Sequence, residues 1–321
     1  MVYGKPALVT AVASFARCQV VTEAATSLTF QSDSFPDTTW SADELRMEYS
    51  SALDRWKQFE AGRLKITDVL SGDHFLPPLC WAELDAAFPG RLSQTVSVRI
   101  TSELPPGGGM GSSAAVCTAT LFALATASCV EAAPSKLFEM CLQLECFQHG
   151  TPSGADPYIA VHGGCLLFKN RGPARPAGAP AVPLHLVHTG RPEATTGEAV
   201  SQVRSTHGGS DIWSEFESTT LKLAAAMTLG DLPGSIRTIR HNHRLLAEIG
   251  IVPDRVRAFI HGVEATGGAA KISGGGSVRG ESGGVVLVCA EQPPRYLCKQ
   301  FGYTTTPLET EPDGVRILGD S

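Results

Sequence analysis

Residues 105–115 read PPGGGMGSSAA, and they join two runs with different hydrophobic patterns. The run before them alternates at Val96, Val98 and Ile100, which predicts a strand, and the Ala- and Leu-rich run after them predicts a helix. A strand, a glycine loop and the first turn of a helix together expose backbone N–H groups, because the first four N–H groups of a helix have no partner inside it. The stretch therefore predicts an anion site, and a phosphate is the anion we expect.

The residue types inside this stretch suit a phosphate. Glycine carries no Cβ and adopts positive φ, so the backbone at 107–109 and at Gly111 can approach phosphate oxygens closely. A hydroxyl of Ser112 or Ser113 can cap the helix, bind a phosphate oxygen or bind the magnesium that accompanies a nucleotide. A plain glycine turn with a serine cap is the alternative. The spacing fits neither the P-loop nor the dinucleotide-binding motif, so another phosphate-binding family is needed.

A second informative segment runs from Glu145 to Asp156. The apolar residues before it recur with the spacing of one buried helix face, at Leu137, Met140 or Cys141, Leu144 and Phe147. Glu145 lies at the edge of that face, where its carboxylate could hold magnesium, and Asp156 follows a Pro/Gly turn, where it could orient or deprotonate a substrate hydroxyl. Taken alone, such a Glu is usually a solvated charge and such an Asp usually closes a turn.

Residues 267–280 form a second glycine-rich loop, with six glycines in fourteen residues. A predicted helix around Val256, Phe259 and Val263 precedes it, and a predicted strand at 285–288 follows it. Such a loop can be a simple turn, but this many glycines cost backbone entropy unless a close approach requires them. The three segments together favour phosphate chemistry over three unrelated turns.

These segments resemble the motifs of the GHMP kinases, the family of galactokinase, homoserine kinase, mevalonate kinase and phosphomevalonate kinase. Residues 105–115 resemble the motif P-x-x-x-G-L-G-S-S-A-A, with Met110 in place of Leu. Residues 267–280 resemble K-x-[ST]-G-x-G, with Ser277-Val278-Arg279 in place of the usual glycine run. Residues 145–156 are most similar to the pattern E-x-x-x-H-G-x-P-S-G-x-D of mevalonate kinases. The resemblance covers nearly the whole chain.

The resemblance implies a fold and an activity. The fold is α+β, with an ATP-binding N-terminal domain like ribosomal protein S5 over 1–172 and a ferredoxin-like C-terminal domain over 181–321. The activity is ATP-dependent phosphorylation of a small-molecule hydroxyl, with mevalonate as the first candidate acceptor and 5-phosphomevalonate as its product. The alternatives are another family member, such as phosphomevalonate kinase, and a nucleotide-binding relative without catalysis. A homodimer is consistent with the family.

The resemblance also implies roles for individual residues. Asp156 would act on the acceptor hydroxyl, and Ser113 and Glu145 would hold Mg²⁺. ATP would be bound by the first glycine loop and the start of the following helix, at Pro106, Gly107, Gly108, Gly109, Gly111, Ser112, Ser113 and Ala114. The alcohol acceptor would be contacted by His149, Ser153, Gly154, Ser273, Gly274 and Gly275. His149 is equally consistent with a hydrogen-bonded structural histidine.

The start of the chain departs from the family pattern. Gly4-Lys5-Pro6-Ala7-Leu8 resembles the segment that follows the first family motif, P-G-K-[VI]-x-L-x-G-E-H, so that motif would lie upstream of Met1. The lysine that usually pairs with the catalytic Asp is then missing from this sequence. We expect that the chain is truncated, and a diverged, inactive relative is the alternative.

Composition agrees with a soluble enzyme, and the cysteine pattern predicts a cytoplasmic protein. A net charge of −6, from 26 Lys and Arg against 32 Asp and Glu, provides no basic field for nucleic acid. Nine cysteines without a C-x-x-C pair predict reduced, buried thiols. The sequence has no signal-peptide pattern and no apolar run of about 18 residues, so we expect no membrane partner.

The remaining patterns predict the order of elements. Helices are predicted at 42–60, 112–130, 134–148, 193–206 and 211–229, and strands are predicted within 7–30, at 94–101 and at 184–187. The stretch 171–180 is rich in Pro, Ala and Gly, which predicts a surface loop or a domain boundary.

Overall fold

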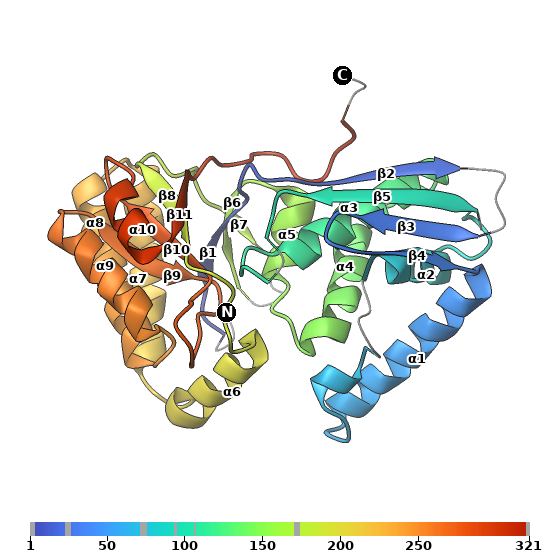
Figure 1. Ribbon diagram of the computed structural model, residues 1–321, viewed down its shortest axis with the longest axis horizontal. Helices are drawn as coiled ribbons and strands as arrows, with labels where there is room; N and C mark the ends of the chain where they lie inside the picture. Colours follow the sequence, from blue (N-terminus) through green and yellow to red (C-terminus); the bar gives the residue numbers. More distant parts are fainter. Residues whose placement is uncertain are drawn as a thin grey trace. The chain divides into compact units, whose positions relative to one another are not determined.

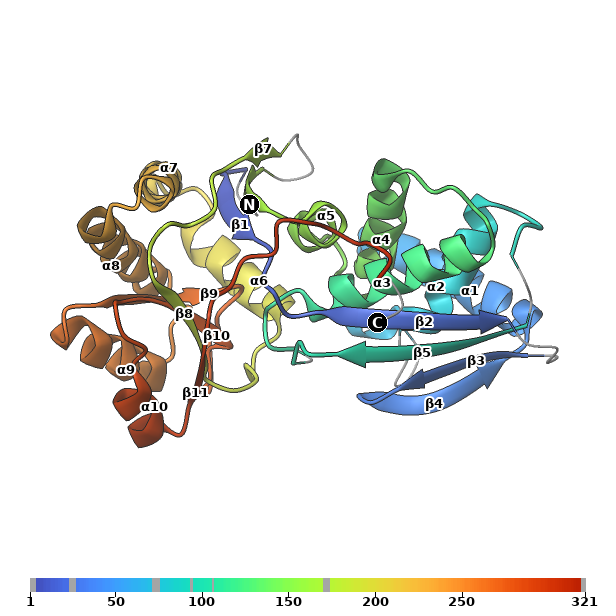
Figure 2. The same ribbon diagram turned by 90° about the horizontal axis from the view of Figure 1, so that it is seen from above.

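A computed structural model describes residues 4–22, 27–70, 76–92, 95–105, 107–169 and 174–318 (Figures 1 and 2). The chain forms two compact units, each built from separated stretches. Unit 1 comprises residues 1–13, 107–110 and 164–312, and unit 2 comprises residues 14–106, 111–163 and 313–321. Four residues of the first glycine loop, 107–110, therefore group with unit 1, whereas the chain on both sides of them belongs to unit 2.

Unit 2 contains a four-stranded sheet in the order β2 (Ala16–Thr22), β5 (Val96–Ser102), β3 (Leu28–Ser32), β4 (Phe35–Trp40). β5 pairs antiparallel with β2 and parallel with β3. The predicted alternation in β5 is confirmed, because Val96, Val98 and Ile100 are all buried. Leu28 and Phe30, which pair with Val96 and Val98, are buried beside them.

Helices cover one face of this sheet, as Figure 2 shows. They are α1 (Ala42–Glu60), α2 (Leu76–Ala87), α3 (Ser112–Ala127), α4 (Pro134–His149) and α5 (Ala155–His162), with a short 3-10 turn at Ile66–Asp68. α3 lies against β2 and contacts α2, α4 and α5, so it is the central helix of the layer. The predicted apolar face of α4 is buried in full, at Leu137, Met140, Cys141, Leu144 and Phe147.

Unit 1 contains two sheets. The smaller has the order β1 (Ala7–Thr10), β6 (Cys165–Phe168), β7 (Arg175–Pro176), and the larger has the order β11 (Thr304–Pro307), β8 (Leu184–His188), β10 (Val285–Cys289), β9 (Ala269–Ser273). All pairs in both sheets are antiparallel.

The helices of unit 1 are α6 (Thr196–His207), α7 (Ile212–Thr228), α8 (Leu232–Glu248), α9 (Asp254–Ala265) and α10 (Arg295–Phe301). α8 and α9 pack on β9, and Figure 1 shows them beside the larger sheet. The helix predicted before the second glycine loop is α9, where Val256, Phe259 and Val263 are buried as expected.

The stretch 171–180 and the predicted domain boundaries lie near the junction of the two compact units in the sequence. The stretch 171–180 is not wholly irregular, because Arg175–Pro176 forms the short strand β7 against β6; residues 171–173 lie outside the described residues. The domain boundaries at 172 and 181 stay a prediction. The compact units divide the chain differently, since β1 pairs with β6 and contacts α7, which groups the start of the chain with residues 164–312.

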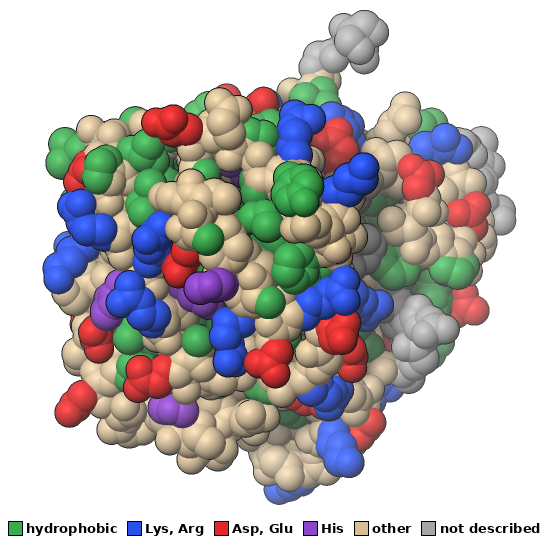
Figure 3. Space-filling model, turned by 60° about the vertical axis from the view of Figure 1, so that its left-hand side comes forward, with side chains coloured by type: hydrophobic (Ala, Val, Ile, Leu, Met, Phe, Trp, Pro, Cys, Tyr) green, Lys and Arg blue, Asp and Glu red, His purple; other side chains and the backbone are tan. Residues whose placement is uncertain are grey.

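The cysteines and the charged side chains are distributed as the composition predicts. All nine cysteines are free thiols, and seven of them are buried. Basic and acidic side chains are interspersed on the face drawn in Figure 3. Among the described residues, no helix has the length and apolar character needed to cross a bilayer.

The core of unit 1 gives a stability prediction. Phe259 is fully buried and makes edge-to-face contacts with Phe301 and Tyr303, at ring-centroid distances of 5.6 and 5.3 Å. Phe259→Ala is expected to lower the free energy of unfolding by about 3–5 kcal/mol, because it leaves a cavity. Urea denaturation followed by circular dichroism measures the loss. Tyr296→Ala, on the exposed face of α10, is the control, and an equal loss in both variants would contradict this core.

Candidate active site

The first part of the site is the N-terminus of α3. Gly111 is its N-cap residue, with a φ of +68°, and its carbonyl accepts the first helical hydrogen bond, from Ala115 at 3.0 Å. The N–H groups of Ser112, Ser113 and Ala114 therefore have no acceptor within the helix. The sequence predicted this arrangement of a glycine followed by free amide groups.

The hydroxyl of Ser113 lies among oxygen atoms from α4. Ser113 Oγ is 2.6 Å from Glu145 Oε1 and 2.9 Å from Gln148 Oε1. Glu145 and Gln148 are three residues apart on α4, so both side chains project from the same side of that helix. Glu145 is buried, as expected for a residue at the edge of the apolar face. The structure thus brings Ser113 and Glu145 together.

Asp156 approaches the same helix end. It lies in the first turn of α5, after Gly154, which is the N-cap residue with a φ of +85°. A Cβ placed on Gly111 would lie 3.1 Å from Cβ of Asp156 and 3.3 Å from its Oδ1. Asp156 can therefore pack beside the start of α3 only because position 111 has no side chain.

The two carboxylates have shifted pKa values. Burial raises the pKa of Glu145 to about 7, and the hydrogen bond from Ser113 opposes the shift. Burial, together with the negative charge of Glu145, raises the pKa of Asp156 to about 6, and His149 opposes this shift. Desolvation lowers the pKa of His149, so at neutral pH its imidazole is uncharged. Shifts of this kind are concentrated at functional sites.

The residues predicted for the acceptor in unit 2 lie between the end of α4 and the start of α5. His149 ends α4, and its Nε2 lies 3.6 Å from Oε2 of Glu145. The Ser153 hydroxyl accepts a hydrogen bond from the backbone N–H of Ala155 at 3.3 Å, so it also supports the start of α5. Gly154 packs against the ring of Phe138.

The glycine loops of unit 1 meet backbone to backbone. Gly107 and Gly109 have positive φ, at +69° and +78°. A Cβ on Gly274 would lie 3.0 Å from the carbonyl oxygen of Gly109, and a Cβ on Gly284 would lie 3.1 Å from that of Gly108. The loops therefore touch at positions that admit only glycine. Pro106 lies outside the described residues.

The other predicted residues of the second glycine loop also lie near this contact. The carbonyl oxygen of Ser273 is 3.9 Å from the Cβ position of Gly109, and Gly275 packs against Thr196 at the start of α6. Burial lowers the pKa of Lys271 to about 8. Ser273 and Gly274 thus lie beside Gly109 of the first glycine loop.

The donor set around Ser113 fits Mg²⁺. This ion prefers oxygen ligands, and at nucleotide sites it commonly takes one or two protein carboxylates together with substrate phosphates and water. Ser113 Oγ, Glu145 and Gln148 Oε1 provide oxygen atoms of that kind. No group of three or more His, Cys, Asp or Glu side chains that could hold an ion occurs within the described part of the chain.

Comparison with known proteins identifies the family. The model for the N-terminal domain of GHMP kinases matches residues 79–164. The mevalonate kinase of Archaeoglobus fulgidus is 30% identical over 68% of this chain and 72% of its own length. The mevalonate kinase of Thermococcus gammatolerans is 27% identical over 81% of this chain and 78% of its own. The chain therefore belongs to the GHMP kinase family.

Solved structures show the same α+β GHMP kinase fold. The mevalonate kinase of Methanococcus jannaschii superimposes with a TM-score of 0.79, at 16% identity, over 97% of this chain and 93% of its own. The galactokinase of Lactococcus lactis, solved with galactose, superimposes with a TM-score of 0.74, at 13% identity, over 98% of this chain and 89% of its own. The predicted fold class is confirmed.

One residue near the predicted site was not given a role from the sequence. Gln148 reaches the Ser113 hydroxyl, and its position three residues after Glu145 on one helix was the available signal. Arg191 belongs to the stretch Thr189-Gly190-Arg191-Pro192, which also resembles the family, but its position against Gly107 was not predicted.

The raised pKa of Glu145 predicts how stability depends on pH. A solvated Glu ionises near pH 4.3, so between about pH 4.3 and 7 the folded chain binds a proton that the unfolded chain has lost. This contribution to stability is complete at low pH and is lost as the pH rises to about 7. Glu145→Gln, which does not ionise, is expected to flatten the dependence and to exceed the wild type at pH 8 by up to about 3 kcal/mol.

Chemical denaturation between pH 5 and 8 measures this difference. Glu139→Gln, at an exposed position of the same helix, is the matched control and is expected to keep the slope of the wild type. Identical slopes for Glu145→Gln and the wild type would contradict the burial of the Glu145 carboxylate.

Proposed function

We propose that this chain is an ATP-dependent small-molecule kinase that transfers the γ-phosphoryl group to the hydroxyl of mevalonate, giving 5-phosphomevalonate. The observation that carries the proposal is the grouping of Asp156 and the Ser113–Glu145 pair at the free N-terminus of α3. Such a site offers amide donors, oxygen ligands and a carboxylate base, which are the parts that phosphoryl transfer requires.

The glycine loop and the helix start would bind the phosphates. The N–H groups of Ser112, Ser113 and Ala114 are free to donate, and the positive end of the helix dipole favours an anion there. The first glycine loop precedes these residues directly in the chain, and its lack of side chains leaves its amide groups accessible to phosphate oxygens. Fixed donors of this kind stabilise the charge that develops during transfer.

Ser113 and Glu145 would hold Mg²⁺. When bound with ATP, the ion supplies positive charge to the phosphate oxygens. The ionised form of Glu145 is the one that binds a cation, and positive charge near it favours that form. The Ser113 hydroxyl orients Glu145 through the hydrogen bond of 2.6 Å.

Asp156 would accept the proton of the acceptor hydroxyl. The hydroxyl oxygen forms a bond to the γ-phosphorus as the bond from that phosphorus to the ADP oxygen breaks, and the hydroxyl proton passes to the Asp156 carboxylate. A pKa of about 6 leaves this carboxylate mostly ionised above pH 7 while making it a stronger base than a solvated Asp.

The identity of the acceptor is supported by two observations. Residues 145–156 keep the spacing E-x-x-x-H-G-x-P-S-G-x-D, and the relatives that cover most of the chain are named mevalonate kinases. We propose that His149, Ser153, Gly154, Ser273, Gly274 and Gly275 contact the acceptor.

A panel of acceptors tests the assignment. Purified protein with ATP and Mg²⁺ is expected to produce ADP with mevalonate and to form 5-phosphomevalonate, measured by a coupled ADP assay and by mass spectrometry of the product. Turnover with phosphomevalonate, homoserine or galactose instead would assign another member of the family. Binding of ATP without transfer to any of the four would favour a non-catalytic relative.

The role of Asp156 gives a second prediction. Asp156→Asn keeps the shape of the side chain but removes the base, so kcat is expected to fall by about 10²–10⁴-fold with little change in ATP binding. In the wild type, kcat is expected to rise with pH through about 6, as Asp156 ionises. Asp33→Asn, in the exposed turn between β3 and β4, is the matched control. A wild-type kcat in Asp156→Asn would remove Asp156 from the mechanism.

A further inference from the structure

The loop at 189–194, which joins β8 to α6, is fixed at its first residue. The backbone N–H and the hydroxyl of Thr189 both donate to the carbonyl oxygen of Gly284, at 2.9 and 2.8 Å. The N–H of Gly283 donates to the Thr189 hydroxyl at 3.0 Å. Thr189 is buried, so these bonds are shielded from water. One end of the 189–194 loop is therefore attached to the segment that follows the second glycine loop.

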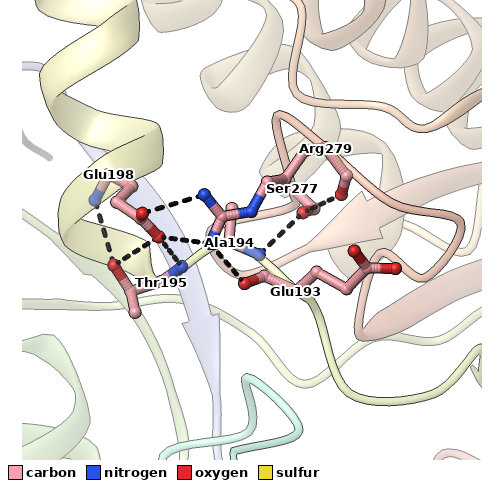
Figure 4. A network of polar contacts seen from close by, with 6 residues as sticks. All are labelled: Glu193, Ala194, Thr195, Glu198, Ser277 and Arg279. Carbon is pink, nitrogen blue, oxygen red and sulfur yellow. Dashed lines mark hydrogen bonds and ion pairs between the residues drawn. The ribbon is translucent and has the colours of Figure 1, made fainter.

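The other end of the 189–194 loop is held by the second glycine loop itself, as Figure 4 shows. The N–H of Ala194 donates to the Ser277 hydroxyl at 3.3 Å, and Arg279 donates to the carbonyl oxygen of Glu193 at 2.9 Å. Arg279 also bonds the carboxylate of Glu198 at 3.0 and 3.3 Å. Hydrogen bonds therefore hold both ends of the 189–194 loop.

Arg191 lies in the middle of the 189–194 loop, and its side chain lies against Gly107 of the first glycine loop. A Cβ placed on Gly107 would lie 3.1 Å from Nε of Arg191 and 3.6 Å from its Cζ. Gly284, which adjoins Pro192, packs against the carbonyl oxygen of Gly108. The 189–194 loop therefore lies beside Gly107 directly, and beside Gly108 through Gly284.

The guanidinium of Arg191 has no acidic partner among the described residues. The residue is exposed, and no hydrogen bond or ion pair joins it to any described residue. The two acidic residues that follow Arg191 in sequence, Glu193 and Glu198, contact other groups. The Glu193 carboxylate lies against Gly280, and the Glu198 carboxylate is bonded to Arg279 and to the N-terminus of α6. A guanidinium placed beside a glycine loop without a counter-ion is suited to an anionic ligand.

We propose that Arg191 binds the phosphate groups of the nucleotide at the first glycine loop. This inference rests on the proposed function, because it takes that loop as the ATP site. Arginine presents planar, bidentate donors that match phosphate oxygens. The fixed ends of the 189–194 loop hold the guanidinium near its ligand before binding, which reduces the ordering needed when the nucleotide arrives.

Calorimetric titration of ATP tests this role. Arg191→Ala is expected to weaken ATP binding by about tenfold or more, the range of a lost charge-assisted hydrogen bond to phosphate. Arg191→Lys keeps the charge but not the bidentate geometry, and an intermediate loss is expected. Arg237→Ala, at an exposed position on α8 of the same unit, is the matched control and is expected to bind ATP as the wild type does.

Adenosine serves as the second ligand, because it has no phosphate. Its affinity is expected to be the same in Arg191→Ala and the wild type, and thermal unfolding midpoints are expected to agree because Arg191 is exposed. Unchanged ATP affinity in Arg191→Ala, or an equal loss for ATP and adenosine, would overturn the role of Arg191 and leave the proposed function standing. Failure of the wild type to bind ATP would overturn both.

Discussion

The structure around the catalytic candidates depends on the missing side chain at Gly111. This residue caps α3 with a φ of +68°, and a Cβ there would lie 3.1 Å from Cβ and 3.2 Å from Cγ of Asp156. A side chain there would strain the backbone at positive φ and require Asp156 to shift by a few tenths of an ångström. The free amide groups of α3, the Ser113 hydroxyl and the Asp156 carboxylate can share one helix end only because position 111 is glycine.

The carboxylates gathered at this helix end oppose stability rather than adding to it. Glu145 accepts a hydrogen bond from Ser113, yet burial still raises its pKa to about 7, and its charge raises the pKa of Asp156 in turn. A buried ionisable pair without a stabilising role is most simply explained by chemistry at the site.

Hydrophobic spacing within short segments predicted individual helices and strands. The apolar spacing from Leu137 to Phe147 predicted α4, and with it the position of Glu145 at the edge of a buried face. Long-range contacts had no such signal. The pairing of β1 with β6 brings together Thr10 and Cys165, which are 155 residues apart in sequence, and Gln148 meets Ser113 across 35 residues. Gln on a helix and Arg191 in a loop are ordinary surface residues until the fold supplies their neighbours.

The second glycine loop shows how a family pattern can change without loss of its main contact. Its glycines with positive φ include Gly274, Gly276 and Gly280, so glycine remains where the backbone requires it. Where the usual glycine run is replaced, the buried Ser277 hydroxyl donates to the carbonyl oxygen of Arg279 at 2.6 Å, and Arg279 reaches Glu198 (Figure 4). Side-chain hydrogen bonds of Ser277 and Arg279 are therefore found where the family pattern has glycines. Gly274 still lies against Gly109, so the contact between the two glycine loops is kept.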